Sequence, residues 1–166
     1  MRHQNKATLK YIPREIGAEM GVKILVATAC GRKKNPRRHK AIELYRSPRI
    51  KAVYNRRNDC DMAILSAKYG LVYSEEIIES YEQILDVNRV EELLPQVISY
   101  IKNYDVVIYF KAGARSLYVE LMNRGAIKAK KPVIFLGHGF MAEINKIPEI
   151  ISEIKNNPEK INSFVF

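Results

Sequence analysis

Four short apolar segments, rich in β-branched residues, constrain the fold of this chain more than any other feature. They span residues 22–29, 61–66, 105–110 and 132–136, and each runs into a turn that precedes a helical segment. Buried parallel strands have such continuous apolar sequences, and strands that alternate with helices are typical of a parallel sheet. The sequence therefore predicts a single-domain α/β fold: a mostly parallel central sheet of about four strands, with helices on both faces.

Helix signals lie between these strands. Ser47 and Pro48 suit an N-cap and a first helical position, so a helix is predicted from there to about residue 57. Apolar residues recur with helical spacing over 90–102, where Pro95 would lie near the first turn. The helix after the third strand is expected to end at Gly125, as a C-terminal cap.

Length and composition limit the domain organisation. A chain of 166 residues with 47% hydrophobic residues suits one domain, expected over 22–160, with an N-terminal extension (1–21) and a C-terminal tail (161–166). Cys30 and Cys60 are too few for a disulfide framework and lack metal-ligand spacing, so we expect no metal and no cofactor. Since no apolar run has the length of a membrane span, we expect a cytoplasmic protein without a membrane partner.

The net charge of +10 is concentrated in one stretch, residues 32–57, which holds eleven Lys and Arg and one acid, Glu43. Such a concentration of charge favours a polyanionic partner, DNA or RNA, although a solvated basic surface is the alternative. The helix from Pro48 would turn its cations outward, toward a phosphate backbone. The residues expected to bind that backbone are Arg37, Arg38, Lys40, Arg46, Arg49, Lys51, Arg56 and Arg57.

Four glycine-containing turns follow the predicted strands. In an open parallel sheet, ligands bind beyond the carboxyl ends of the strands, and glycine lets backbone amides approach an anion. A nucleotide or phosphate ligand is therefore expected, although no P-loop and no GxGxxG pattern occurs. The candidate substrate-binding residues are Gly31, Arg32, Lys33, Lys34, Tyr45, Tyr69, Gly70, Tyr81, Gly113, Arg115, Gly137 and Gly139.

Four side chains in these turns are candidate catalytic groups. Cys30 follows a strand beside several cations that would favour a reactive thiolate, although cysteines in such places more often only pack. Ser66, with Lys68 nearby, is a candidate nucleophile or a turn cap. His138, between two glycines, is a candidate general acid or base, or a histidine without a catalytic role.

Two carboxylates near Tyr81 are a further possibility. Glu79 and Glu82 would serve base or glycosidic-bond chemistry if they lay near the crevice, because a carboxylate can activate water or stabilise a cationic transition state. Otherwise they only balance the basic residues. Their distance from the crevice decides between these readings.

Three segments in the first half of the chain resemble an uncharacterised family of phage, bacterial and archaeal proteins. ACGRKK (29–34), AIELYRSP (41–48) and ILSAKYGLV (64–72), with Tyr81 following, are similar to the family pattern CGKKK, LYxSxxF, ILSAKHGLL and an acidic stretch with PY. Tyr69 stands where the family commonly has histidine.

More distantly, the third segment resembles one in the peroxide-stress protein YaaA family, which is associated with DNA binding. The Cys-x-x-Lys turn and the sheet order resemble the uracil-DNA-glycosylase-like domain of archaeosine-forming tRNA modification enzymes. These resemblances imply a Rossmann-like α/β fold and a nucleic-acid context. Our leading hypothesis is a nucleic-acid-associated protein that binds DNA or RNA phosphates through residues 32–57 and places a nucleotide or base in the crevice. Catalysis, if present, would be base or glycosidic-bond chemistry without a metal. A small-molecule nucleotide enzyme and a non-catalytic binding module are the alternatives.

Overall fold

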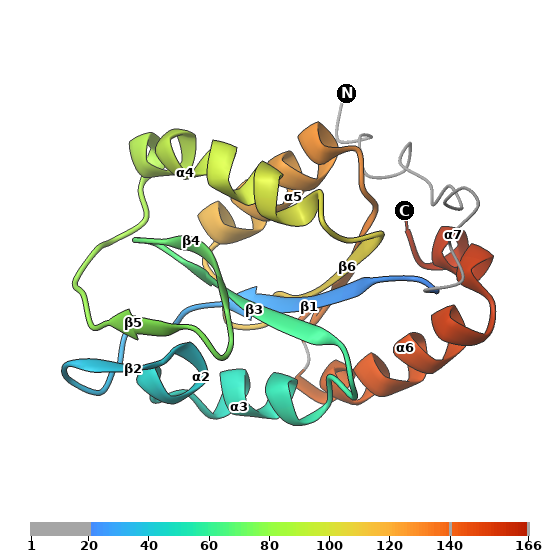
Figure 1. Ribbon diagram of the computed structural model, residues 1–166, viewed down its shortest axis with the longest axis horizontal. Coiled ribbons are helices and arrows are strands. Elements are labelled where there is room, and N and C mark those ends of the chain that lie inside the picture. The colour runs from blue at the N-terminus through green and yellow to red at the C-terminus, as the bar shows by residue number, and fades with distance from the viewer. Residues whose placement is uncertain (1–20, 140, 166) are drawn as a thin grey trace.

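A five-stranded mixed sheet forms the centre of the molecule in a computed structural model, which describes residues 21–139 and 141–165 (Figure 1). Its strand order is β4-β3-β1-β6-β7. β1 is parallel to β3 and β6, and β7 is parallel to β6, whereas β4 is antiparallel to β3. The strands are β1 (Ile24–Ala29), β3 (Asp61–Ser66), β4 (Gly70–Tyr73), β6 (Val106–Phe110) and β7 (Val133–Leu136).

The single-domain α/β fold and the four predicted strands are confirmed, but the sheet has a fifth strand, β4. Gly70 has a φ of +78°, which lets the chain reverse after β3 and return beside it. Gln96 covers the outer edge of β4, because its side chain accepts a hydrogen bond from the amide of Leu71 and donates one to the carbonyl of Leu71, both at 2.8 Å.

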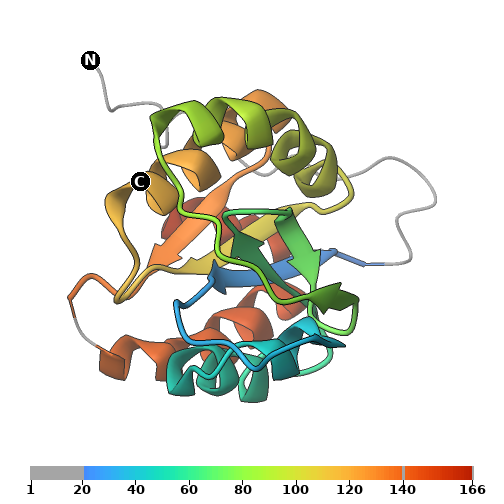
Figure 2. The same ribbon diagram turned by 90° about the vertical axis from the view of Figure 1, so that its left-hand side faces the viewer.

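Helices cover both faces of the sheet (Figures 1 and 2). α4 (Val87–Ile101) and α5 (Ser116–Ala129) pack on one face, where Leu25 and Ala27 of β1 are buried. α3 (Pro48–Asn55) and α6 (Lys146–Asn156) pack on the other, together with the shorter elements α2 (Ala41–Leu44), η2 (Met141–Asn145), η3 (Pro158–Lys160) and α7 (Ile161–Phe164). All six residues of β1 are buried, as its continuous apolar sequence requires.

The expected start of α3 is confirmed: the Ser47 side chain accepts a hydrogen bond from the amide of Ile50, and Pro48 is the first helical residue. Two other helix boundaries were wrong. α4 begins at Val87, so Pro95 lies inside the helix. Gly125 lies inside α5, where a Cβ atom would be 2.6 Å from Val97 Cγ1; this glycine serves close helix packing instead of capping.

Two segments outside the main sheet also take part in the fold. The acidic stretch after β4 includes β5 (Ile77–Glu79), which pairs antiparallel with β2 (Arg38–Lys40) in the basic stretch. In the segment expected as a C-terminal tail, Ile161 and Val165 are buried against the α6 layer. The expected N-terminal extension lies outside the described residues, apart from Gly21.

Candidate functional site

The carboxyl ends of β1 and β6 border a cavity of about 540 Å³, which we call the cationic crevice. Among the described residues, its charged lining consists of four cations and one carboxylate: Arg32, Lys34, Arg49, Arg115 and Glu82. The crevice lies beyond the strand ends, as the topology of an open parallel sheet requires. Its charge favours an anionic ligand.

Arg49 is the most deeply placed of these cations. Its guanidinium group donates to the Thr28 hydroxyl at 2.6 Å and to the Ala29 carbonyl at 3.0 Å. Burial lowers the pKa of Arg49, and no ion pair with a carboxylate is found for it within the described chain. The expectation that Arg49 faces outward was wrong, because from the second position of α3 the long side chain reaches the end of β1.

A hydrogen-bonded pair of tyrosines supports one wall of the crevice. The hydroxyls of Tyr45 and Tyr81 lie 2.6 Å apart, and Ser66 Oγ donates to the Tyr81 hydroxyl at 2.9 Å. Burial raises the pKa of both tyrosines, so they are neutral at physiological pH. Lys34 Nζ lies 4.5 Å from the centre of the Tyr81 ring, a cation–π contact that orients this lysine at the crevice.

Of the four catalytic candidates, Cys30 is the one that lines the cationic crevice. Its Sγ atom lies 3.3 Å from the hydroxyl of Tyr118, which comes from α5. Burial is the main cause that raises the pKa of Tyr118, so this hydroxyl remains protonated and can donate to Cys30 Sγ.

Ser66 and Lys68 form a turn instead of a catalytic pair. Ser66 is fully buried, and its oxygen accepts hydrogen bonds from the backbone amides of Lys68 and Tyr69, both at 3.1 Å. The Lys68 ammonium lies over the Tyr69 ring. Gly70 is buried against Gln96. The crevice lining therefore includes none of the four candidates in this turn, Ser66, Lys68, Tyr69 and Gly70.

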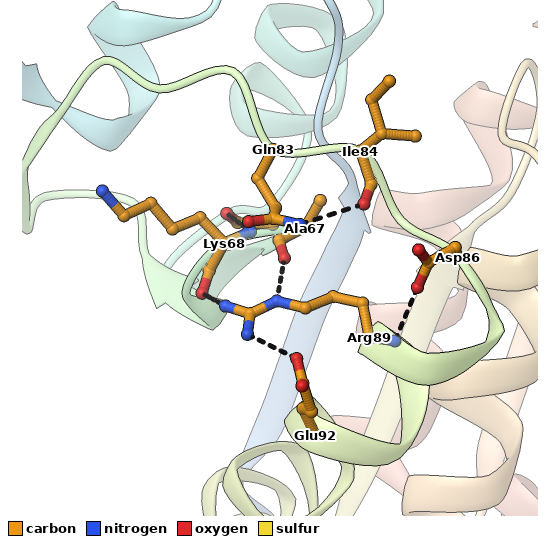
Figure 3. A network of polar contacts seen from close by, with 8 residues as sticks. Ala67, Lys68, Gln83, Ile84, Asp86, Arg89 and Glu92 are labelled. Atoms are coloured by element: carbon orange, nitrogen blue, oxygen red, sulfur yellow. Dashed lines mark hydrogen bonds and ion pairs between the residues drawn. The ribbon is translucent and has the colours of Figure 1, made fainter.

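Arg89, which the sequence reasoning missed, holds this turn from α4 (Figure 3). Its Nε atom donates to the Ala67 carbonyl at 2.9 Å, and its guanidinium also binds the Lys68 carbonyl and pairs with Glu92. The Asp86 side chain caps α4 by accepting from the Arg89 amide at 2.8 Å. These contacts fix the β3–β4 turn to the start of α4. The segment that carries Glu82 leads directly into this helix start.

His138 lies in a second, larger hollow, of about 930 Å³, on the other side of the loop between β6 and α5. We call it the α5 hollow. The amides of Gly137 and His138, expected to bind phosphate, donate instead to Glu143 Oε1 at 2.6 and 2.9 Å. These bonds hold the pKa of Glu143 below its usual range. His138 Nε2 is 3.0 Å from the Phe135 carbonyl.

The two acidic residues near Tyr81 differ in position. Glu82 lines the cationic crevice. Glu79 lies outside it, in β5, where its carboxylate pairs with Arg38 at 3.7 Å on the surface. Of these two carboxylates, Glu82 is therefore the one that lies in the crevice.

The basic stretch divides into engaged and free side chains. Lys40 pairs with Glu75, Arg56 binds Asn145, Arg57 stacks on Tyr54, and Lys51 reaches the Ile42 carbonyl at 3.5 Å. Within residues 32–57, four exposed cations have no side-chain hydrogen bond or ion pair to the described part of the chain. We call them the free cation group: Arg32, Lys33, Arg37 and Arg46.

Two further classes of feature are not found in the described part of the chain. No cluster of three or more His, Cys, Asp and Glu side chains is arranged to hold a metal ion. No described helix combines the length and the apolar character that crossing a membrane requires.

One comparison with known proteins gives a match. The chain matches no curated protein and no solved structure. Residues 24–139 match the model of a family of unknown function, DUF6884. This match runs from β1 to the Gly137–Gly139 turn and so contains both the cationic crevice and the free cation group. The chain therefore belongs to DUF6884, a family of unknown function.

Proposed function

We propose that this protein binds a nucleic acid, with backbone phosphates on the free cation group and one nucleotide in the cationic crevice. The observation that carries the proposal is the position of Arg32, which lines the crevice and also belongs to the exposed free cation group. A phosphate chain on the surface and a nucleotide in the crevice would thus meet at one cation. Arginine and lysine side chains on phosphates supply most of the affinity in such complexes.

The crevice has the size and charge for one nucleotide. Its volume of about 540 Å³ falls within the range of pockets that bind small ligands. Arg49 supports an anion there, because a half-buried guanidinium without a carboxylate partner gains from an anionic ligand. The resemblance of the first half of the chain to families with a DNA-binding or tRNA-modifying context agrees with this proposal. We propose, on the same resemblance, that the fold is Rossmann-like and of the uracil-DNA-glycosylase-like type.

We assign the reaction to the base or the glycosidic bond of the bound nucleotide. Glu82 and Cys30 are the groups that support this part of the proposal, because both line the crevice. The carboxylate of Glu82 would activate water or stabilise positive charge on the sugar, chemistry that needs no metal.

Binding at two salt concentrations tests the proposal. Fluorescence anisotropy would measure the affinity for labelled single-stranded DNA, single-stranded RNA and duplex DNA. If the four free cations each neutralise one phosphate of a single strand, affinity falls about 50-fold between about 50 and about 200 mM salt. No binding at the lower concentration would refute the proposal. Salt-insensitive binding of a free nucleotide would favour the small-molecule nucleotide enzyme. Binding of a nucleic acid without release of a base would favour the non-catalytic binding module.

A further inference from the structure

The α5 hollow differs chemically from the cationic crevice. Its lining includes apolar side chains from three segments: Ala112 and Ala114 of the loop before α5, Val119 of α5, and Met141 of η2, which is 49% exposed. Lys111 and Glu120 bring one positive and one negative charge. The hollow therefore favours an uncharged, partly apolar group over a phosphate.

Asn123 adds a hydrogen-bonding group to this apolar lining. Its carbonyl oxygen is buried and has no hydrogen-bond partner within the described chain. An unsatisfied buried acceptor is costly, so a rotation of the amide that presents this oxygen to a donor on a ligand would be favoured. Rotation about the Cβ–Cγ bond brings either the oxygen or the nitrogen of the amide to the hollow, and an amide can pair with the edge of a nucleobase.

The two cavities adjoin across the loop between β6 and α5. Gly113 and Ala114 line both of them. Neither of these two residues has a side chain larger than a methyl group, and a Cβ added to Gly113 would approach only the Arg49 side chain, at 3.7 Å. A ligand chain can therefore cross from one cavity to the other at this point.

We propose that the α5 hollow holds the base of the nucleotide adjacent to the one in the cationic crevice. This inference rests on the proposed function and defines its ligand as a single strand, because adjacent bases must separate to enter two cavities. Asn123 binds the edge of the second base, and the apolar lining contacts its faces. The apolar contacts do not depend on the identity of the base, whereas the Asn123 amide favours a base whose edge it can pair with.

Two labelled hexanucleotides of equal charge test this inference. One carries a base on every sugar, and the other lacks every second base, so that it cannot fill both cavities with adjacent bases. We expect the native protein to bind the complete strand about tenfold more tightly. Asn123→Ala should reduce this preference to about threefold or less, and Met141→Ser should weaken binding of the complete strand about threefold. Asn156→Ala, at the exposed end of α6, is the matched control and should change nothing.

The outcomes separate this inference from the proposed function. Equal affinity of the native protein for both hexanucleotides would overturn the inference, while salt-dependent binding of both would leave the proposed function intact. A tenfold preference that survives in both variants would also overturn it. If neither hexanucleotide binds at low salt, the proposed function fails, and the inference with it.

Discussion

Arg49 donates a hydrogen bond of 2.6 Å to the Thr28 hydroxyl, and Thr28 in turn donates one of 2.8 Å to the Phe110 carbonyl. This chain joins α3, β1 and β6 at the carboxyl edge of the sheet. Because the Thr28 side chain is fully buried, the position of the Arg49 guanidinium is set by the core of the protein and not by the surface. A cation fixed in this way is preorganised for an anion.

Replacing Arg49 by methionine removes this charge while keeping much of the volume. We expect affinity for a single-stranded oligonucleotide to fall at least about tenfold, because a charge-assisted bond to phosphate is lost. The free energy of unfolding should fall by about 1–3 kcal/mol, since strand-end oxygens lose their donor. Arg124→Met, on the exposed side of α5, is the control for binding. An Arg49→Met variant that is less stable but binds like the native protein would show that Arg49 is purely structural.

The glycines on either side of His138 provide a matched pair of stability tests. A Cβ atom at Gly137 would lie 2.7 Å from the Ala112 backbone nitrogen, whereas one at Gly139 meets nothing within 4 Å. Both residues have positive φ, 87° and 96°. We expect Gly137→Ala to cost about 2–5 kcal/mol and Gly139→Ala about 1–2 kcal/mol in urea unfolding. Equal costs would mean that the Ala112 turn yields to the added methyl.

Buried tyrosines predict a loss of stability at alkaline pH. Burial raises the pKa of Tyr45, Tyr81 and Tyr118 above the ordinary value of 10.0, and that of Tyr100 to about 12. Because the unfolded chain loses these protons first, their contribution is fully present below pH 10.0 and is lost as pH rises beyond it. Above that pH, each of these tyrosines lowers the free energy of unfolding by up to about 1.4 kcal/mol per pH unit.

Urea unfolding between about pH 8 and about pH 11 measures this loss. Tyr81→Phe removes one ionising group, so the free energy of unfolding should fall less steeply with pH above pH 10.0. At neutral pH the variant should be less stable by about 1–3 kcal/mol, because Ser66 and Tyr45 lose a buried partner. A stability that stays level to about pH 11 would contradict the prediction.

Glu82 is the acidic residue on which the proposed reaction depends. We expect the native protein to release a free base from a single-stranded oligonucleotide, detected by chromatography, and Glu82→Gln to reduce the rate at least about 100-fold. Binding should not weaken, because the substitution removes the carboxylate from a cationic crevice. Glu79→Gln, outside the crevice, should keep the native rate. Base release that persists in Glu82→Gln would exclude this role.

Much of the fold could be predicted because continuous apolar runs define β1, β3, β6 and β7 without tertiary information. β4 could not, since only three residues follow Gly70 and their pairing depends on the reversal that this glycine permits. Gly125 was wrongly predicted to cap α5. In a sequence, a glycine that lets a neighbouring helix pack closely looks the same as a glycine that ends its own helix.

The candidate site was predictable only where a residue's place along the chain determines its position. Cys30 and Arg32 follow β1 directly, and the topology brings them to the crevice. Arg49 and Arg89 lie on helices, and their long side chains reach carbonyls at the ends of strands. Helix periodicity does not predict such contacts, so Arg49 was expected to face outward and Arg89 was not a candidate. The Gly137 turn was misread because Glu143, six residues later, occupies the amides that a ligand would need.

The salt dependence of nucleic-acid binding tests the central claim most directly. In anisotropy titrations with a single strand, the slope of log affinity against log salt should be about −3.5 for the native protein, if the free cation group and Arg49 each neutralise one phosphate. A variant with glutamine at all four positions of the free cation group should keep a slope of only about −0.7, from Arg49 in the crevice. The matched control replaces four cations away from the crevice, Lys102, Lys128, Lys130 and Lys131. The account predicts that only the first variant loses most of the slope. Equal slopes in the two variants would contradict it.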